Sequence, residues 1–154
     1  MSLLPDTAKN PGGFGVTDSL DALMDLHTLS VDTQRGFLKM REKAEADFLP
    51  VANKFSTLHG EHIARLATMV KDMGGLPDAD GSFMGAVNTA VVTLRALFDD
   101  IDSGVMTQVR RGEDHVLAAF DRAIDASLPE GHADTLRQMK SELITLLDDT
   151  RDLT

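Results

Sequence analysis

Four long stretches of the chain repeat apolar residues at intervals of three and four, the spacing that places side chains on one face of an α-helix. They cover residues 17–46, 47–73, 102–126 and 127–153. Helices of this length must bury their apolar faces against one another, which predicts an all-α fold. The stripe positions are Leu20, Leu23, Leu26, Ser30, Thr33, Phe37, Met40, Ala44, Phe55, His59, His62, Leu66, Met69, Met73, Met106, Val109, Glu113, Val116, Phe120, Ala123, Leu136, Met139, Leu143, Leu146, Thr150 and Leu153.

The links between these helices predict how they are arranged. A short link near residue 46 makes the first two helices antiparallel neighbours. Residues 74–82 are dense in Gly, Asp and Pro, and an apolar helix is expected over residues 83–98. Residues 127–130, Ser-Leu-Pro-Glu, have the form of a capping box for the last helix. We therefore predict an antiparallel four-helix bundle with a long helical crossover between its second and third helices.

The first residues differ from the rest in composition. Residues 1–16 contain Pro5, Pro11 and three glycines, which break regular structure. We expect a flexible N-terminal arm over residues 1–16 and one bundle domain over residues 17–154, because a chain of 154 residues suits a single core.

Charge and composition exclude several classes of function. Twenty-five acidic and fifteen basic residues give a net charge of -10, which repels phosphate backbones and anionic lipids. Neither nucleic acid nor a membrane is expected as a partner. The chain has no Cys, which removes disulfides, thiolate nucleophiles and cysteine metal sites. With no signal-peptide core in the first 15 residues and no apolar run of about 20, a cytoplasmic location is expected.

Two histidines stand out in the second predicted helix. His59 and His62 are three residues apart, so they share one helix face, and His62 falls on the apolar stripe. This spacing suits two ligands of a metal ion. A buried neutral imidazole that bonds a hydroxyl or carboxylate across the bundle explains it equally well.

Glu113 is the most suggestive acidic residue, because a carboxylate on an apolar stripe needs a cation, a metal or hydrogen-bond donors. A small rotation of the helix would instead place it at the core margin, in a solvated ion pair with Arg110 or Arg111. Metal ligation would use His62 and Glu113, with Asp32 as a further ligand. Glu-x-x-His occurs nowhere in the chain, which argues against a standard dinuclear carboxylate centre.

Gly36, Gly60 and Gly112 each interrupt a predicted helix, at a cost of about 1 kcal/mol each relative to Ala. Close contact between helices is the usual reason for such glycines, and a cavity for a small ligand is the rarer one.

Several short motifs resemble one family. They are Asp32-x-x-x-Gly36-Phe37, Gly74-Gly-x-Pro-Asp-x-x-Gly-Ser82 before an Ala-rich helix, Arg111-Gly-Glu-Asp114, and Leu128-Pro129. In their order and spacing the chain resembles the DUF2383 family, ferritin-like bundles of bacteria with unknown function, over about residues 18–153. The resemblance implies a ferritin-like four-helix fold with a helical crossover.

The chain also departs from the pattern that this resemblance implies. Family members commonly carry a Glu where this chain has Gln34, and a His-Asp pair near the position of Leu146 or Leu147. These departures weaken the case for a metal centre, because an amide and an alkyl chain replace likely ligands.

Three functions remain after these exclusions. The first is a non-catalytic bundle that acts through self-association, as a homo-oligomer, or through a protein partner, since no catalytic set of residues converges. The second is a metal-binding bundle of a degenerate di-iron type, which would hold iron, manganese or zinc for a redox or storage role. A sensor that binds a small apolar ligand between its helices ranks last. No catalytic residue and no organic cofactor is predicted.

Overall fold

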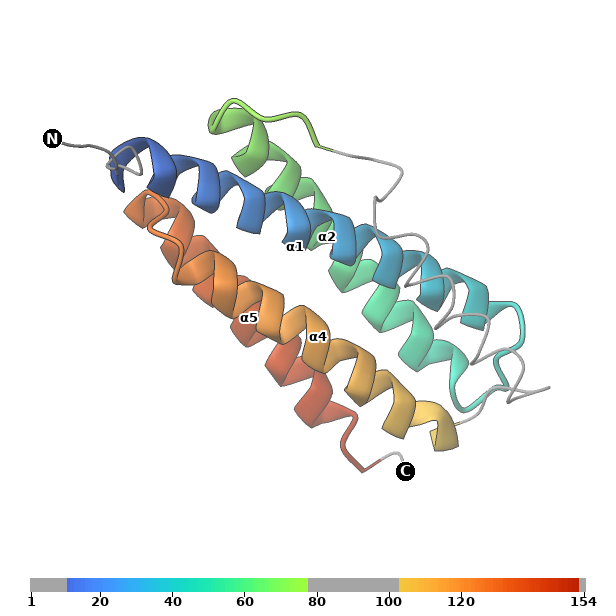
Figure 1. The fold of residues 1–154 in the computed structure, drawn as a ribbon. Helices are drawn as coiled ribbons and strands as arrows, with labels where there is room; N and C mark the ends of the chain where they lie inside the picture. Colours follow the sequence, from blue (N-terminus) through green and yellow to red (C-terminus); the bar gives the residue numbers. More distant parts are fainter. Residues whose placement is uncertain (1–10, 78–102, 153–154) are drawn as a thin grey trace, which may run out of the picture.

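The computed structural model describes residues 11–77 and 103–152 of the chain. They form four long α-helices: α1 (Pro11–Arg41), α2 (Leu49–Asp72), α4 (Met106–Ile124) and α5 (Glu130–Asp149). A short 3-10 helix, η2 (Ser103–Val105), leads into α4. The predicted all-α four-helix bundle is confirmed (Figure 1).

Each of the four long helices packs against two of the others. The first helix, α1, packs against α2 and α4, and α5 packs against the same two helices. Consequently α2 and α4 are diagonally opposite, and neighbouring helices run antiparallel (Figure 1). The end of α2 and the start of α4 lie at opposite ends of the bundle (Figure 1). The predicted crossover between them, with the helix predicted at residues 83–98, lies outside the described residues.

The first helix begins earlier than the sequence suggested. It starts at Pro11 and includes residues 11–16, which the composition assigned to an arm. Proline is well tolerated at the first helical position, because its fixed φ suits the helix and its missing N–H would have no partner there. The remaining arm residues, 1–10, lie outside the described part of the chain.

The end of α2 follows the predicted Gly-Gly signal. Gly74 has a φ of 87°, and its N–H donates to the carbonyl of Lys71. The N–H of Gly75 donates to the carbonyl of Val70 at 2.9 Å. This pair of bonds is the Schellman arrangement, which needs a residue in the left-handed region, where glycine has no Cβ clash.

The predicted capping box before α5 is wrong. The helix starts at Glu130 with Pro129 as its N-cap, and no side chain caps it. Ser127 has a φ of 64° and lies three residues before the first helical residue. A capping hydroxyl must directly precede the first helical residue to reach the free N–H groups, so Ser127 is too far away.

The core follows the predicted stripes, which bury aliphatic and phenylalanine side chains between the helices. Phe37 of α1 and Phe55 of α2 stack with their ring centroids 4.9 Å apart. At one end of the bundle, the hydroxyl of Ser19 in α1 donates to the carbonyl of Ala126, which follows α4. These contacts fix the stagger of α1 against both of its neighbours.

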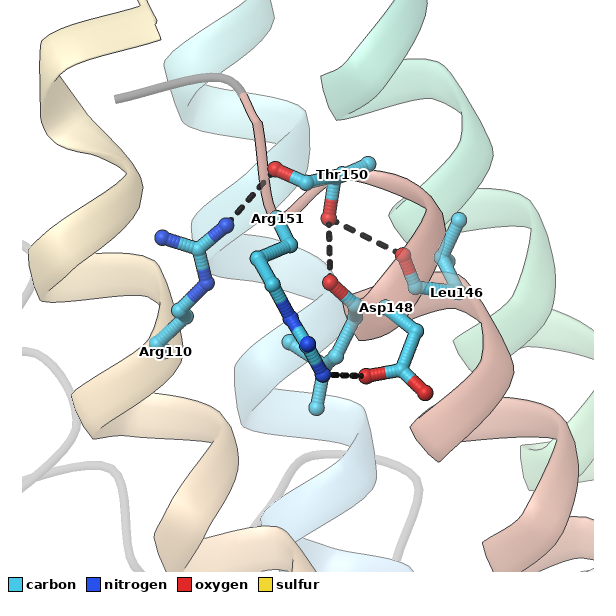
Figure 2. A network of polar contacts seen from close by, with 6 residues as sticks. Arg110, Leu146, Asp148, Thr150 and Arg151 are labelled. Carbon is cyan, nitrogen blue, oxygen red and sulfur yellow. Dashed lines mark hydrogen bonds and ion pairs between the residues drawn. The ribbon is translucent and has the colours of Figure 1, made fainter.

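The C-terminal end of α5 is tied to α4 by one arginine (Figure 2). Arg110 of α4 donates to the carbonyl of Thr150 at 2.6 Å. The hydroxyl of Thr150, which is buried, donates to the carbonyls of Leu146 and Leu147. Arg151 pairs with Asp148 beside them. The Arg110 cation thus meets the C-cap carbonyl of α5, where the helix dipole favours positive charge.

Candidate functional site

The most unusual feature of the core is a pair of buried histidines on α2. His59 and His62 both have 0% of their surface exposed. The stripe that buries Phe55 and Leu66 on the same helix carries both imidazoles into the bundle. The two rings meet edge to face, with centroids 6.5 Å apart.

His59 bonds Glu113 across the diagonal of the bundle. The distance from Nε2 of His59 to Oε2 of Glu113 is 2.7 Å, and Glu113 is 1% exposed. The structure thus decides between the two predictions for this carboxylate. Glu113 lies in the core, and the solvated ion pair at the core margin is wrong, because Arg110 is turned toward Thr150 instead.

His62 bonds a second carboxylate, on α5. Its Nε2 lies 2.9 Å from Oε1 of Glu142, whose side chain is 32% exposed. Arg65 lies 3.7 Å from the same oxygen. The apolar pattern of the sequence does not single out Glu142, although this residue lies three residues after Met139 and four before Leu146, at the border of the α5 stripe. We call His59, His62, Glu113 and Glu142 the His–Glu centre.

Aromatic rings enclose the two imidazoles. Phe37 stacks on His59 and Phe120 meets His62 edge-on, each with a centroid distance of 5.9 Å. Both phenylalanines are buried. They restrict rotation of the imidazoles and keep the centre in a medium of low polarity, where hydrogen bonds and charges interact strongly.

Burial shapes the protonation of the centre. It lowers the pKa of His62, and the hydrogen bond to Glu142 acts in the opposite direction with a smaller effect. His62 is therefore neutral at pH 7. In the tautomer whose Nε2 donates to Glu142, Nδ1 of His62 keeps its lone pair.

Several polar atoms of the centre have no hydrogen-bond partner within the described part of the chain. They are Nδ1 of His59, Nδ1 of His62 and Oε1 of Glu113, all of them buried. Unpaired buried polar atoms are rare in folded proteins, and a water molecule, an ion or a catalytic role commonly accounts for them. The centre therefore offers two imidazole nitrogens and one carboxylate oxygen to a ligand.

The predicted ligand set is brought together only in part. His62 and Glu113 both belong to the centre, but each bonds a residue that was not in the set. Asp32 is buried on α1. It lies five residues before Phe37, roughly 140° around the helix, so it faces away from the side of α1 that contacts His59. Across residues 11–77 and 103–152, no three His, Asp or Glu side chains converge closely enough to hold a metal ion between them.

Gln34 makes a contact between α1 and α2 that depends on its amide group. Its side-chain amide donates to the carbonyl of Ser56 in α2 at 3.1 Å, a bond that a carboxylate could not make. A Cβ on Gly60 would lie 2.8 Å from the same amide nitrogen. The predicted close contact is therefore found at Gly60, whereas a Cβ on Gly112 would meet nothing within 4 Å.

A groove of about 420 Å³ runs along the surface between α2 and α5. Glu142 lines it, so this residue borders both the groove and the His–Glu centre. A second groove, of about 590 Å³, lies between α1 and α2 and is lined partly by Val31, Leu38 and Ile63.

Comparisons with known proteins support the family resemblance and add no activity. The family model described as a domain of unknown function, DUF2383, matches residues 18–126. No curated protein and no solved structure matches the chain. None of the helices in the described ranges is both long enough and apolar enough to cross a membrane.

Proposed function

The chain belongs to the DUF2383 family, whose description assigns no activity, and we propose that it is a metal-binding bundle protein that holds one divalent transition-metal ion at the His–Glu centre. One observation carries the proposal. Each of two buried imidazoles bonds a carboxylate through Nε2 and leaves Nδ1 without a partner within the described residues. We therefore rank the second function left open by the sequence ahead of the first.

This arrangement matches the way in which proteins prepare histidines for metals. A metal-binding imidazole usually donates its second N–H to a carboxylate, which fixes the tautomer and makes the ligating nitrogen more basic. His62 would hold the ion through Nδ1, and Glu142 orients its ring. His59, oriented by Glu113, would join only after the two rings turn toward each other, because their centroids lie 6.5 Å apart. Because the described side chains do not form a closed set of ligands, water completes the coordination. A site of this kind binds less tightly than a closed structural site.

The donor atoms indicate which ions fit. Imidazole nitrogens favour zinc and ferrous iron, while hard oxygen-only sites favour magnesium and calcium. The carboxyl groups of Glu113 and Glu142, which bond the two imidazoles, add oxygen atoms to these nitrogens. Iron would supply redox or storage chemistry, and zinc would not, so the identity of the bound ion separates these roles.

The competing interpretation is purely structural. Buried polar pairs can fix the register of packed helices without binding anything. In that case the unpaired nitrogens accept hydrogen bonds from water, and metals have no effect on stability.

Titration of chelator-treated protein distinguishes the two interpretations. Zinc, or ferrous iron without oxygen, is expected to bind at one equivalent and to raise the unfolding temperature, because a ligand at about 100 times its Kd stabilises the folded state by about 2.7 kcal/mol. The variant His62→Ala should lose binding. The variant Glu113→Gln should weaken it by about 10-fold to 100-fold, the usual effect of removing a residue that orients a ligand.

The matched control is His115→Ala, which removes an exposed histidine from α4 and should bind like the wild type. Metal far below one equivalent, with no change in unfolding temperature for any of zinc, iron or manganese, would refute the proposal.

Self-association or binding of a protein partner is the second candidate function. Exposed apolar side chains favour it, namely Leu76 at 82% and, less strongly, Leu38, Leu49 and Ile144. Light scattering at increasing concentration tests it directly, since a homo-oligomer gives a multiple of the 16.7 kDa chain mass. A ferritin-like relationship, a bacterial origin and a cytoplasmic location stay predictions from the sequence.

A further inference from the structure

We infer that the groove between α1 and α2 binds an aliphatic carboxylate, a small molecule with an apolar chain and an anionic head group. We call it the α1–α2 groove, and its volume is about 590 Å³. Small-molecule sites in proteins commonly measure about 300 to 1,000 Å³. The inference goes beyond the proposed function and does not depend on metal binding.

The middle of the α1–α2 groove is apolar. Val31 of α1 lines it together with Ile63 and Ala67 of α2. Ile63 and Ala67 are four residues apart, so they share one face of their helix. Leu38 lines the groove as well, and it is 40% exposed. An apolar chain laid along these side chains would remove their surface from water, which favours binding.

The charges in the groove are opposite in sign to the net charge of the chain. Arg35, Lys71 and the imidazole of His27 line the groove, and none of the described residues that line it is acidic. The chain as a whole has 25 acidic and 15 basic residues. A cleft lined by one sign of charge attracts ligands of the opposite sign. The groove therefore favours an anion, whereas the net charge of the chain repels one.

Lys71 is positioned to receive the head group. Its side chain is exposed, and it forms no ion pair within the described part of the chain. The neighbouring carboxylate, Asp72, lies 3.8 Å from His132 of α5 instead. Lys71 therefore keeps its positive charge available to a carboxylate in the groove.

The packing of α1 against α2 sets the direction of the ligand. The two helices run antiparallel, and Gln34 donates to the carbonyl of Ser56. Lys71 follows Ser56 along α2, and Leu38 follows Gln34 along α1, so they lie toward opposite ends of the groove. A head group at Lys71 thus leaves the apolar chain to run over Ile63 toward Leu38.

Calorimetric titration of chelator-treated protein tests the inference, with dodecanoate below its micelle concentration as the probe. Dodecyltrimethylammonium has the same apolar chain and the opposite charge. The net charge of -10 alone would favour this cationic probe. We expect dodecanoate to bind at one equivalent and the cationic probe to bind more weakly. Octanoate should bind at least about 10-fold more weakly than dodecanoate, because fully burying one methylene gives about 4-fold in affinity.

Two pairs of variants locate the site. Ala67→Phe fills the middle of the groove and should abolish dodecanoate binding. Ala64→Phe is its matched control, because it makes the same change on α2 at an exposed position outside the groove. Lys71→Gln should weaken dodecanoate binding about 2-fold to 5-fold, the usual effect of losing one exposed ion pair. Lys54→Gln, at an exposed position on the same helix, should bind dodecanoate like the wild type.

Circular dichroism checks that each variant is folded, and the Lys71→Gln result decides if Ala67→Phe is not. Equal affinity for the anionic and cationic probes overturns the inference, and so does dodecanoate binding that neither Ala67→Phe nor Lys71→Gln weakens. A dimer in light scattering that Ala67→Phe dissociates, with no dodecanoate bound, also overturns it, because a second copy of the chain then occupies the groove. Zinc binding and dodecanoate binding are measured separately, so the failure of one leaves the other standing.

Discussion

Replacing His59 by leucine should expose the energetic role of its bond to Glu113. The substitution removes the hydrogen bond between Nε2 and Oε2 at 2.7 Å and leaves a carboxyl group that is 1% exposed. The other oxygen of Glu113 already lacks a partner within the described residues. After the change, no side chain in the described part of the chain would satisfy this carboxylate.

The magnitude follows from that burial. Removing one partner of a buried charged pair destabilises a protein by about 3 to 5 kcal/mol, whereas replacing both partners by apolar residues of similar size is nearly neutral. We expect His59→Leu to lower the free energy of unfolding by about 3 kcal/mol or more. The double variant His59→Leu/Glu113→Leu should recover most of that free energy. For a chain of this size the single variant should unfold roughly 6 to 12 °C below the wild type.

Urea unfolding followed by circular dichroism at 222 nm measures the effect, with the wild type, both single variants and the double variant compared at pH 7 in chelator. The four free energies of unfolding form a double-mutant cycle, which isolates the interaction of the two side chains. His132→Leu is the control, because this partly exposed histidine lies 3.8 Å from Asp72 at the surface. Its expected loss is below about 0.5 kcal/mol.

Two results would refute the reasoning. One is a loss below about 1 kcal/mol for His59→Leu, which would mean that Glu113 is solvated without its histidine. The other is a double variant whose loss of stability relative to the wild type equals the sum of the two single losses, because additive effects mean no interaction between the two side chains.

Further predictions concern the helices, the histidine protonation and the end of α5. Gly112→Ala should raise the free energy of unfolding by about 0.5 to 1 kcal/mol in urea, since the new Cβ meets nothing within 4 Å in an exposed part of α4. Gly74→Ala should lower the free energy of unfolding by about 1 kcal/mol, because residue 74 has a φ of 87°. In metal-free protein, the free energy of unfolding should be highest above the ordinary His pKa of 6.5. It should fall as the pH drops from there toward the lowered pKa of His62, because the unfolded chain binds the proton first. The variant His62→Gln should weaken this dependence of the free energy of unfolding on pH. Arg110→Met should lose about 1.5 kcal/mol and speed amide exchange in the last turn of α5, because its bond to the carbonyl of Thr150 disappears.

The helices were predictable because their signals are local. The stripe through Phe55, His62 and Leu66 repeats within one segment. That face of the helix is buried regardless of which other helix packs against it. The end of α2 was predictable for the same local reason, since the left-handed conformation at this position favours glycine and the sequence has Gly74 there. The start of α1 at Pro11 and the failed capping box at Ser127 show the opposite case, where several local signals compete at a boundary.

The candidate site was predictable only as separate residues. The sequence identified the two histidines of α2 and the acidic residue Glu113 on the α4 stripe. It did not identify Glu142, because a glutamate at the border of an apolar stripe is common and most such residues are solvated. It also included Asp32, which shares a helix with residues of the core but points to another side.

The pattern of residues by itself determined that this chain is helical, which faces are buried, and that ionisable groups fall on those faces. Only the tertiary structure decided that His59 meets Glu113, 54 residues away, and that His62 meets Glu142, 80 residues away. The physical reason is that a helix fixes the relative directions of its own side chains, whereas the rotation and stagger of one helix against another depend on how all the side chains between them pack.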